Sequence, residues 1–377
     1  MFNESTAVIK TTKLCNLRCK YCYEFEHLAD PTVMLDEEIS IMIERLSELS
    51  THFESKMKFC WHGGEPLLVK REKYLSAFSA QEQSFEYNVK NIIQTNLFHL
   101  NGKNLETLRL FDSISTSFDP IDNERVSISE MSTQDSVALN MGKLRTEGLP
   151  FGVVTVLHAG NYDKIDATFE FFNRSSLSFR VLPYYREANV TATDKYGLSL
   201  STIKQCYLRL LELWFTKGTH IQIYPIYEYV LIATRFHMNC GNPYRYDKFS
   251  MEHVFIIDTN GDIYTAGTAY NKLFAYGNIF DDDMRSIVHS DGRKRACERS
   301  ASLMSTACEN CKFFGACPGY YIAEQTDVEL AANDTGKSCP IAFDCIEYAL
   351  GWIEKMSDAA LAGLSNPTEN DGLEVSR

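Results

Sequence analysis

The feature that most constrains this chain is a group of three cysteines, Cys15, Cys19 and Cys22, within eight residues. The run before them, residues 7–12, is rich in β-branched residues and predicts a strand, so one loop can carry all three thiolates to one metal centre. A closed iron–sulfur site uses four cysteines, whereas three leave a position open, much as catalytic zinc keeps a free position. A structural zinc loop or incidental thiols would be the alternative. The triad therefore predicts a metal centre with an open position.

The twelve cysteines are concentrated at the two ends of the chain. Six lie between Cys297 and Cys345, and the scattered ones are Cys60, Cys206 and Cys240. The first residues, MFNESTAVIK, lack the basic start and apolar core of a secretion signal. We therefore expect a cytoplasmic protein whose cysteines bind metal rather than form disulfides.

Charge and hydropathy exclude two classes of partner. The net charge is −13, and no Lys/Arg-rich run suggests a surface for nucleic acid or anionic membrane. No apolar run approaches the length that spans a bilayer. We expect neither a nucleic-acid nor a membrane partner.

Short apolar runs alternate with amphipathic segments through the first half of the chain, which is typical of parallel strands joined by helices. Residues 35–50 have apolar residues at helical spacing behind an acidic first turn, which predicts a crossover helix. Six βα units fit an α/β fold, a partial (β/α)6 TIM-like barrel, in which chemistry collects after the strand ends. The six strands are expected at residues 7–12, 57–63, 91–96, 113–119, 151–158 and 177–185.

The pattern changes near residue 200. Residues 223–236 predict a helix, and residues 253–266 predict a β-hairpin whose Asn260-Gly261 suits a type I′ turn. A cysteine-rich segment, an apolar helix over residues 346–356 and a polar tail follow. We expect four parts: a barrel over 1–200, a helical linker over 201–238, a small cysteine-rich domain with the hairpin over 239–360, and a disordered tail over 361–377.

The spacing C-x3-C-x2-C followed by an aromatic residue, here Tyr23, is the signature of the radical S-adenosylmethionine superfamily, which this chain resembles. The resemblance implies that Cys15, Cys19 and Cys22 hold a [4Fe–4S] cluster, with Tyr23 beside the cofactor. It also implies that the open iron binds S-adenosylmethionine, whose cleavage by an electron gives a 5′-deoxyadenosyl radical. A reductant of the flavodoxin or ferredoxin type is implied as a partner.

Three further segments resemble the family's motifs, in the required order and at strand ends. After the second strand, WHGGEP resembles the GGEP motif, in which glycines let the backbone approach the methionine ammonium and the acid helps to hold it. The third strand ends in a TNG-like motif with Leu97 in place of glycine, and the fourth ends in polar residues that imply contacts to ribose and carboxylate. A plain turn and ordinary strand polarity are the alternatives. The implied cofactor-binding residues are Gly63, Gly64, Glu65, Thr95, Asn96, Ser115, Ser117 and Arg125, with Asp119 nearby.

Cys308, Cys311 and Cys317 have the C-x2-C-x5-C spacing of the SPASM domain, an extension with auxiliary [4Fe–4S] clusters in peptide-modifying members of the superfamily. A zinc ribbon is the alternative for the first pair. The fourth ligand is expected from Cys345 or Cys339. Cys345 is preferred because the apolar helix that follows it resembles the family's ending.

The resemblance also implies a first auxiliary cluster, from which this sequence departs. Cys240 could supply one ligand, but Ala266 and Tyr321 stand where two further cysteines are expected. We therefore expect one auxiliary cluster and two clusters in all. Cys206 and Cys297 could restore the site by folding nearby, although buried free thiols are the expected fate of both, as of Cys60.

The resemblance implies peptide substrates, and WHGGEPLL resembles the subgroup that cross-links side chains of ribosomally made precursor peptides. In this hypothesis the auxiliary cluster accepts the electron released at ring closure. An anaerobic sulfatase maturase, which makes formylglycine in a protein, is the alternative; that group carries an Asp where this chain has Gly267. A third hypothesis is a non-catalytic iron–sulfur or zinc scaffold. The sequence identifies no catalytic acid or base, and with the first strand so near Met1 we expect no N-terminal leader-binding domain.

Overall fold

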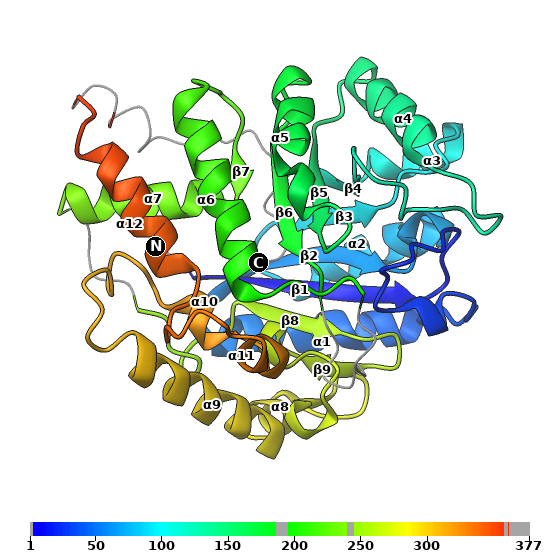
Figure 1. Cartoon of the computed structure of the whole chain (residues 1–377). Coiled ribbons are helices and arrows are strands. Elements are labelled where there is room, and N and C mark those ends of the chain that lie inside the picture. The colour runs from blue at the N-terminus through cyan, green and yellow to red at the C-terminus, as the bar shows by residue number, and fades with distance from the viewer. Residues whose placement is uncertain (1–2, 186–194, 240–244, 358–360, 362–377) are drawn as a thin grey trace.

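The computed structural model describes residues 3–185, 195–239, 245–357 and 361. Within these residues, ten strands form one curved sheet in the order β10-β9-β8-β1-β2-β3-β4-β5-β6-β7 (Figure 1). Neighbouring strands from β1 to β7 are parallel, as are β8 and β1, whereas β8, β9 and β10 pair antiparallel. The carboxyl ends of the parallel strands therefore meet at one edge of the sheet.

The six predicted strands and the helices between them are confirmed. The strands are β1 (Asn3–Thr12), β2 (Ser55–Gly63), β3 (Lys90–Thr95), β4 (Ser113–Ser117), β5 (Phe151–Leu157) and β6 (Phe179–Pro183). The helices are α1 (Asp36–His52), α2 (Arg71–Ser84), α3 (Gly102–Leu108), α4 (Gln134–Thr146) and α5 (Ile165–Arg174). In α1, three acidic residues of the first turn interact favourably with the positive end of the helix dipole. The buried side chains of this helix recur at helical spacing.

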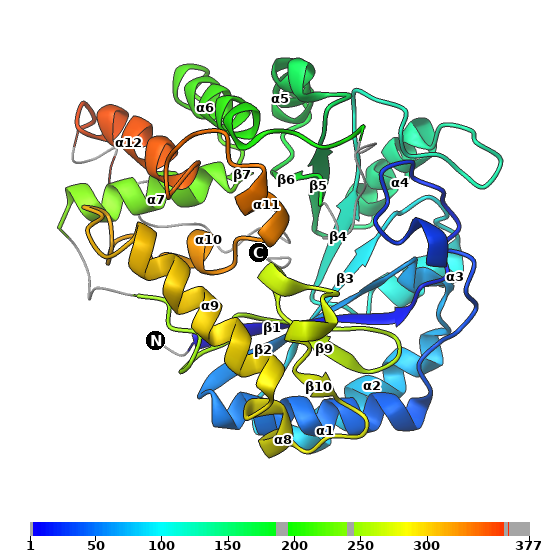
Figure 2. The same ribbon diagram turned by 60° about the horizontal axis from the view of Figure 1, so that its bottom comes forward.

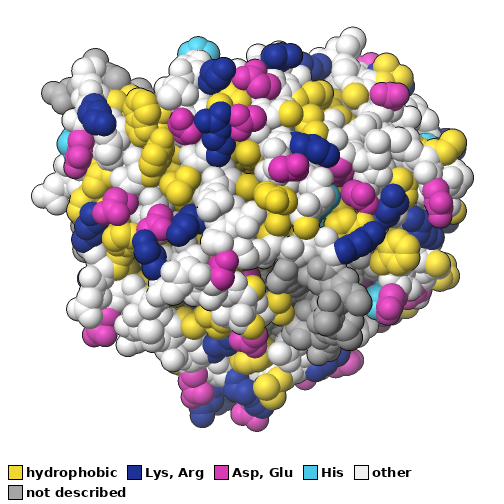
Figure 3. Space-filling model, viewed as in Figure 1, with side chains coloured by type: hydrophobic (Ala, Val, Ile, Leu, Met, Phe, Trp, Pro, Cys, Tyr) yellow, Lys and Arg dark blue, Asp and Glu magenta, His cyan; other side chains and the backbone are white. Residues whose placement is uncertain are grey.

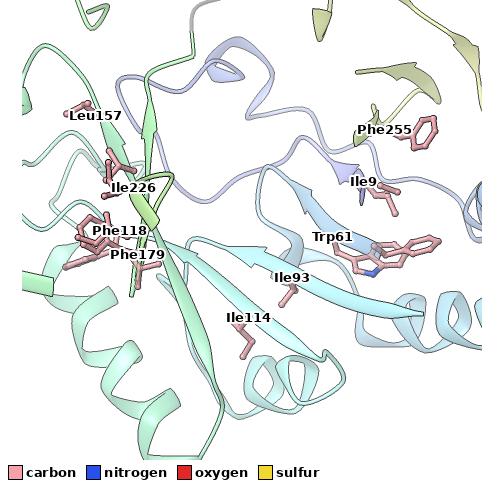
Figure 4. Packing of buried hydrophobic residues seen from close by; sticks show 14 of the residues in the cluster. Ile9, Trp61, Ile93, Ile114, Phe118, Leu157, Phe179, Ile226 and Phe255 are labelled. Carbon is pink, nitrogen blue, oxygen red and sulfur yellow. The ribbon is translucent and has the colours of Figure 1, made fainter. Parts of the chain in front are cut away.

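The two faces of the sheet carry different side chains. Ile9, Trp61, Ile93 and Ile114 belong to the main core, which the helices cover (Figure 4). Because side chains alternate along a strand, their neighbours point to the opposite, interior face. There, a smaller group that we call the interior apolar cluster contains Val8, Cys60, Ile92 and Val254.

The predicted linker contributes a strand to the sheet. The segment contains α6 (Leu200–Thr216), β7 (Ile223–Tyr224) and α7 (Ile226–His237). The prediction of one helix over residues 223–236 is therefore wrong for its first two residues, which pair with Phe179 and Arg180. The physical reason is Pro225, because a residue that precedes proline is disfavoured in helical conformation.

The hairpin is confirmed as β8 (Val254–Ile257) and β9 (Asp262–Tyr264), but its predicted type I′ turn is wrong. A type I′ turn needs positive φ at both central residues. Gly261 has φ +87°, whereas Asn260 is not among the residues with positive φ, and the Asp258 amide donates to the Asp262 carbonyl at 3.0 Å across a longer connection.

Short strands and helices complete the chain around this hairpin (Figure 2). They are β10 (Gly277–Asn278), α8 (Met284–Val288), α9 (Asp291–Ala307), α10 (Tyr320–Ala323), α11 (Asp327–Ala331) and α12 (Ala342–Ile353). Helix α12 confirms the predicted apolar helix and packs against α6 and α7 (Figure 1). The predicted tail lies outside the described residues, apart from Leu361, which is buried.

Acidic and basic side chains are interspersed on the face seen in Figure 3. No helix in the described part of the chain is long and apolar enough to cross a membrane.

Candidate active site

The loop after β1 carries the cysteine triad and is tied down by backbone hydrogen bonds. The Cys15 amide donates to the Leu28 carbonyl at 3.0 Å. The amides of Arg18 and Lys20 donate to the carbonyls of Val126 and Glu124, at 2.7 and 2.9 Å. The segment after β4 therefore holds the loop at the carboxyl edge of the sheet.

The three thiols share one apolar environment. Cys15 and Cys19 are buried with Leu17, Tyr21, Leu28 and Tyr196, and the half-buried Cys22 packs against this group. Burial raises the pKa of Cys15 to about 12 and that of Cys22 to about 11, and it also raises the pKa of Cys19. Such thiols ionise readily only with a cation beside them, so the donor set fits an iron cluster.

No group of three or more His, Cys, Asp or Glu side chains among the described residues is arranged to hold one metal ion. A four-iron cluster binds each cysteine to a different iron, so its thiols surround a larger centre than the ligands of one ion do. The shared environment of the triad is compatible with such a centre.

Gly63, the last residue of β2, and Gly64, which follows it, lie against the backbone at the end of β1 and just after it. Gly63 has φ +125°, which favours glycine. A Cβ built on Gly64 would lie 2.2 Å from the Leu14 carbonyl oxygen and 2.3 Å from that of Lys13. Any side chain at position 64 would therefore displace the cysteine loop.

Glu65 joins this motif to the end of β3. Its Oε1 accepts hydrogen bonds from the Thr95 hydroxyl at 2.7 Å and the Leu67 amide at 2.9 Å, and its Oε2 accepts one from the Asn96 amide at 2.8 Å. Burial raises the pKa of Glu65, although these hydrogen bonds oppose the rise. The Asn96 Nδ2 donates to Asn16 Oδ1 at 2.8 Å and lies 3.7 Å from the Cys15 sulfur. The structure thus brings three predicted residues together beside the triad, and their contact with S-adenosylmethionine stays a prediction.

Leu97, which stands where the TNG motif has glycine, takes the glycine-like conformation. Its φ is +52°, and its side chain is fully buried in the main core. The Asn140 side chain donates to the carbonyl of Leu97 at 3.0 Å. The surrounding contacts hold a strained residue in place.

The predicted serines of β4 lie on the interior face with a residue that the sequence prediction missed. The Gln94 Nε2 donates to the Ser117 hydroxyl at 2.9 Å, and Gln94 is paired with Ser115 across the strands. The Ser115 hydroxyl and Gln94 Oε1 are buried without a hydrogen-bond partner. Unsatisfied buried polar atoms of this kind fit a site for a polar ligand. Gln94 could have been found from sequence, since it lies two residues before Asn96 on the same strand face.

Arg125 lies beside the triad and contacts Tyr21, another residue that was missed. Its guanidinium donates to the Tyr21 hydroxyl at 2.8 Å, and Tyr21 donates to the Asp119 carboxylate. Asp119 also accepts from the Thr155 hydroxyl and the Val156 amide, both at 2.9 Å. The positive charge of Arg125 acts to lower the pKa of Cys19, although burial raises it overall. Arg125 is thus placed to stabilise negative charge at the triad.

Tyr23 is directed away from this group, towards the hairpin side of the interior. Its ring lies 5.7 Å from that of Tyr185 and 5.8 Å from that of Tyr270. The buried Lys10 ammonium lies 4.0 Å from the centroid of the Tyr270 ring and forms an ion pair with Glu24. Tyr184 packs near the triad.

One cavity lies among the C-terminal cysteines. Cys308, Cys311, Cys317 and Cys339 line it together with aromatic and aliphatic side chains. Cys345 is fully buried in the main core and is absent from the lining. The preference for Cys345 as fourth ligand stays a prediction. Cys339, on the segment before α12, lines the cavity with the other three, whereas Cys345 lies on α12.

Three further cysteines in the described part of the chain lie in different surroundings. Cys206 lies on α6 with its thiol 3.6 Å from the Tyr162 carbonyl, Cys60 belongs to the interior apolar cluster, and Cys297 lies 3.5 Å from the Lys248 carbonyl. Cys240 lies outside the described residues.

Known families and proteins are similar in sequence to this chain. The family model described as Radical SAM superfamily matches residues 9–172. The chain is 24% identical to the uncharacterized protein sll1766 of Synechocystis over 83% of this chain and 82% of that protein. It is 22% identical to a cysteine-type anaerobic sulfatase-maturating enzyme of Clostridium novyi, over 80% of this chain and 83% of that enzyme.

Two solved structures share the fold. Native anSMEcpe with bound AdoMet and the Cp18Cys peptide superposes with a TM-score of 0.71 at 17% identity, over 96% of this chain and 99% of that one. SuiB of Streptococcus suis superposes with a TM-score of 0.58 at 14% identity, over 90% of this chain and 76% of that one. The architecture described above is thus that of known structures.

Proposed function

We propose, from the premise that residues 9–172 of this chain form a radical S-adenosylmethionine domain, that the protein oxidatively cross-links side chains of a ribosomally made precursor peptide. The proposed cofactors are a [4Fe–4S] cluster on Cys15, Cys19 and Cys22, S-adenosylmethionine, and one auxiliary [4Fe–4S] cluster. The fold shared with a peptide-bound structure supports a peptide or protein substrate.

The observation that carries the proposal is the pair of separate cysteine sites. Three thiols lie at the strand ends, and four line the C-terminal cavity (Cys308, Cys311, Cys317 and Cys339). An open set of three suits a cluster that binds a substrate at one iron, whereas a closed set of four suits electron transfer. An oxidative cross-link needs both functions, because closing the new bond releases an electron and a proton.

The residues around the triad have separable roles in this proposal. When bound, the cluster and S-adenosylmethionine supply a radical that abstracts hydrogen from unactivated carbon. Arg125 offsets negative charge beside Cys19, while Glu65 fixes the end of β3 against the GGEP segment. Ser115 and Gln94 offer polar atoms to the cofactor from the interior face. Lys10 and the tyrosines around it exclude water on the hairpin side.

Formylglycine formation is the second candidate, and the relatives named as sulfatase-maturating enzymes favour it. Against it stands Gly267, where that group carries an acidic residue. A Cβ on Gly267 would lie 2.6 Å from the Glu324 carbonyl oxygen, so this backbone has no room for a carboxylate there.

The test begins with a search for a short open reading frame beside the gene. The reduced, iron-loaded protein is then incubated with S-adenosylmethionine and the peptide that this frame encodes. A cross-link is expected to remove two hydrogens per modification in the mass spectrum, without an aldehyde. A product that reacts with a hydrazide probe would indicate formylglycine and contradict the proposal. A scaffold without catalysis would form no 5′-deoxyadenosine at all.

A further inference from the structure

The place where a first auxiliary cluster would join the hairpin to α10 does not fit such a cluster. Ala266, just after the hairpin, packs against the interior apolar cluster, and Tyr321 donates its hydroxyl hydrogen to Glu228. Neither side chain can ligate iron in the ordinary way. Cys60 and Cys297 lie in different surroundings, because Cys60 belongs to the interior apolar cluster and the Cys297 thiol lies 3.5 Å from the Lys248 carbonyl oxygen.

A buried ionic network occupies the neighbourhood instead. The Lys248 ammonium lies 2.7 Å from Glu252 Oε1 and 2.6 Å from Glu324 Oε1, and it donates to the Thr265 hydroxyl at 2.8 Å. The side chains of Lys248, Glu252 and Glu324 are 2%, 1% and 6% exposed. We call these three residues the ion clamp.

The ion clamp links the two segments that a cluster would have linked. Glu324 comes three residues after Tyr321, and its Oε2 accepts from the Gly267 amide at 3.1 Å, next to Ala266. The same oxygen lies 3.2 Å from the Thr265 hydroxyl. The Glu324 carboxylate on one segment thus binds the backbone of the other segment directly, and the Lys248 ammonium neutralises this carboxylate.

Hydroxyl groups complete the network. Tyr276 donates to Glu252 Oε2 at 2.7 Å, and Tyr246 donates to Glu324 Oε1 at 3.1 Å. Two carboxylates share one ammonium, so these hydroxyls stabilise the charge that Lys248 leaves unbalanced. A buried network of this kind holds its geometry when complete and is costly when one member is removed.

The segment that the ion clamp holds borders the site. After Gly267 the chain reaches Ala269, whose carbonyl accepts from the Tyr185 hydroxyl at 3.2 Å, and Tyr270, whose ring covers Lys10. Residues 265–270 therefore form the wall of the interior next to Tyr23.

We infer that the ion clamp replaces the first auxiliary cluster as the tie between the hairpin and α10, and that it positions residues 265–270 beside the active site without metal. Lys248, Glu252 and Glu324 are positioning residues. The inference does not depend on the substrate or on the bond that the enzyme makes.

The test is hydrogen–deuterium exchange of the full-length, iron-loaded protein, followed in peptides that cover residues 262–270. Glu324→Gln and Lys248→Met are expected to speed exchange there more than tenfold, and Lys248→Arg, which keeps the charge, by less. The matched control is Lys312→Met, which breaks the exposed pair of Lys312 with Glu347 in the same part of the chain and should leave residues 262–270 unchanged.

Removal of iron by a chelator should leave exchange at residues 262–270 of the parent protein unchanged. Acceleration by the chelator to the level of Glu324→Gln would show that metal is the tie and overturn the inference, as would unchanged exchange in Glu324→Gln. Thr265→Val removes only one hydroxyl group, and it replaces the charge variants in this experiment if those variants do not fold. It is expected to speed exchange in the same peptides, and parent-like exchange would contradict the inference.

Discussion

At the scale of single residues, the cofactor motifs work through backbone geometry as much as through functional groups. Gly64 leaves space for the carbonyls of Lys13 and Leu14, so the cysteine loop can pass directly over it. At position 97, by contrast, a bulky leucine occupies a backbone conformation that favours glycine. Burial of its side chain offsets the backbone strain.

Leu97→Gly should destabilise the protein even though it restores the family's glycine. Relief of the left-handed backbone is worth about 1–2 kcal/mol, whereas losing a buried leucine costs about 2–5 kcal/mol. We expect a net loss of about 1–3 kcal/mol in the free energy of unfolding, measured by urea denaturation. Leu97→Ala keeps the strain and should be less stable than Leu97→Gly, and a Leu97→Gly variant more stable than the parent would refute this balance.

Gly64→Ala should prevent the cysteine loop from closing over the triad site. The added methyl group would meet two carbonyl oxygens closer than 2.5 Å, so we expect loss of the cluster on Cys15, Cys19 and Cys22 and at least a tenfold fall in 5′-deoxyadenosine formation. Iron content and product yield measure the two effects. The control is Gly142→Ala on α4, where nothing lies within 4 Å and alanine favours the helix. Normal iron content in Gly64→Ala would contradict this prediction, because it would show that the cysteine loop can move to accommodate the methyl group.

At the scale of elements, the C-terminal ligand set depends on how one segment folds back. Helix α9 ends just before Cys308, and the turns after it carry Cys311 and Cys317. Cys339 comes from a segment more than twenty residues further along the chain and completes the cavity lining. The helix that follows, α12, buries Cys345 against the main core instead.

Cys339→Ala and Cys345→Ala separate the two candidate ligands. Because Cys339 lines the cavity and Cys345 does not, Cys339→Ala should lose about four irons per chain and Cys345→Ala should keep them. Iron and acid-labile sulfide assays measure the difference. The reverse pattern would restore Cys345 as the fourth ligand and require a rearrangement of the segment before α12.

At the scale of the whole molecule, the proposed function divides the reaction between a cysteine site in the barrel and one in the C-terminal part. The barrel carries the open site at its strand ends, while α12, which follows the closed site, packs on α6 and α7. The hairpin joins the same sheet through the pairing of β8 with β1, so the parts form one continuous framework.

The reconstituted protein should contain about eight irons per chain, because two cysteine sets among the described residues fit a four-iron cluster. A reproducible content near twelve would contradict the loss of the first auxiliary cluster.

Joint replacement of Cys308 and Cys311 by Ala should uncouple the cleavage of S-adenosylmethionine from the cross-linking of the peptide. The barrel keeps its three thiols, so 5′-deoxyadenosine should still form, whereas cross-linked peptide should be lost because the electron has no acceptor. Liquid chromatography of the nucleoside and mass spectrometry of the peptide measure the two products. Undiminished cross-linking would remove the proposed role of the auxiliary site.

Local sequence signals predicted the elements well and the pairing between distant segments poorly. The strands, the helix α1 and the order of the cofactor motifs follow from side-chain periodicity and from motif spacing, which are properties of neighbouring residues. Residues 223–224 were missed as a strand because two residues show no period. Gln94 and Tyr21 were missed because their hydrogen-bond partners are far away in the sequence.

The sequence alone reveals the triad, the strand-end motifs and the absence of cysteine at positions 266 and 321. The reason is that the spacing of ligands within one loop is a local property, which does not depend on how distant segments pack. The position of Cys339 at the cavity, the contact of Arg125 with Tyr21, and the salt bridges of Lys248 required the folded molecule. Each joins residues far apart in sequence, and such contacts depend on how whole elements pack rather than on local preference.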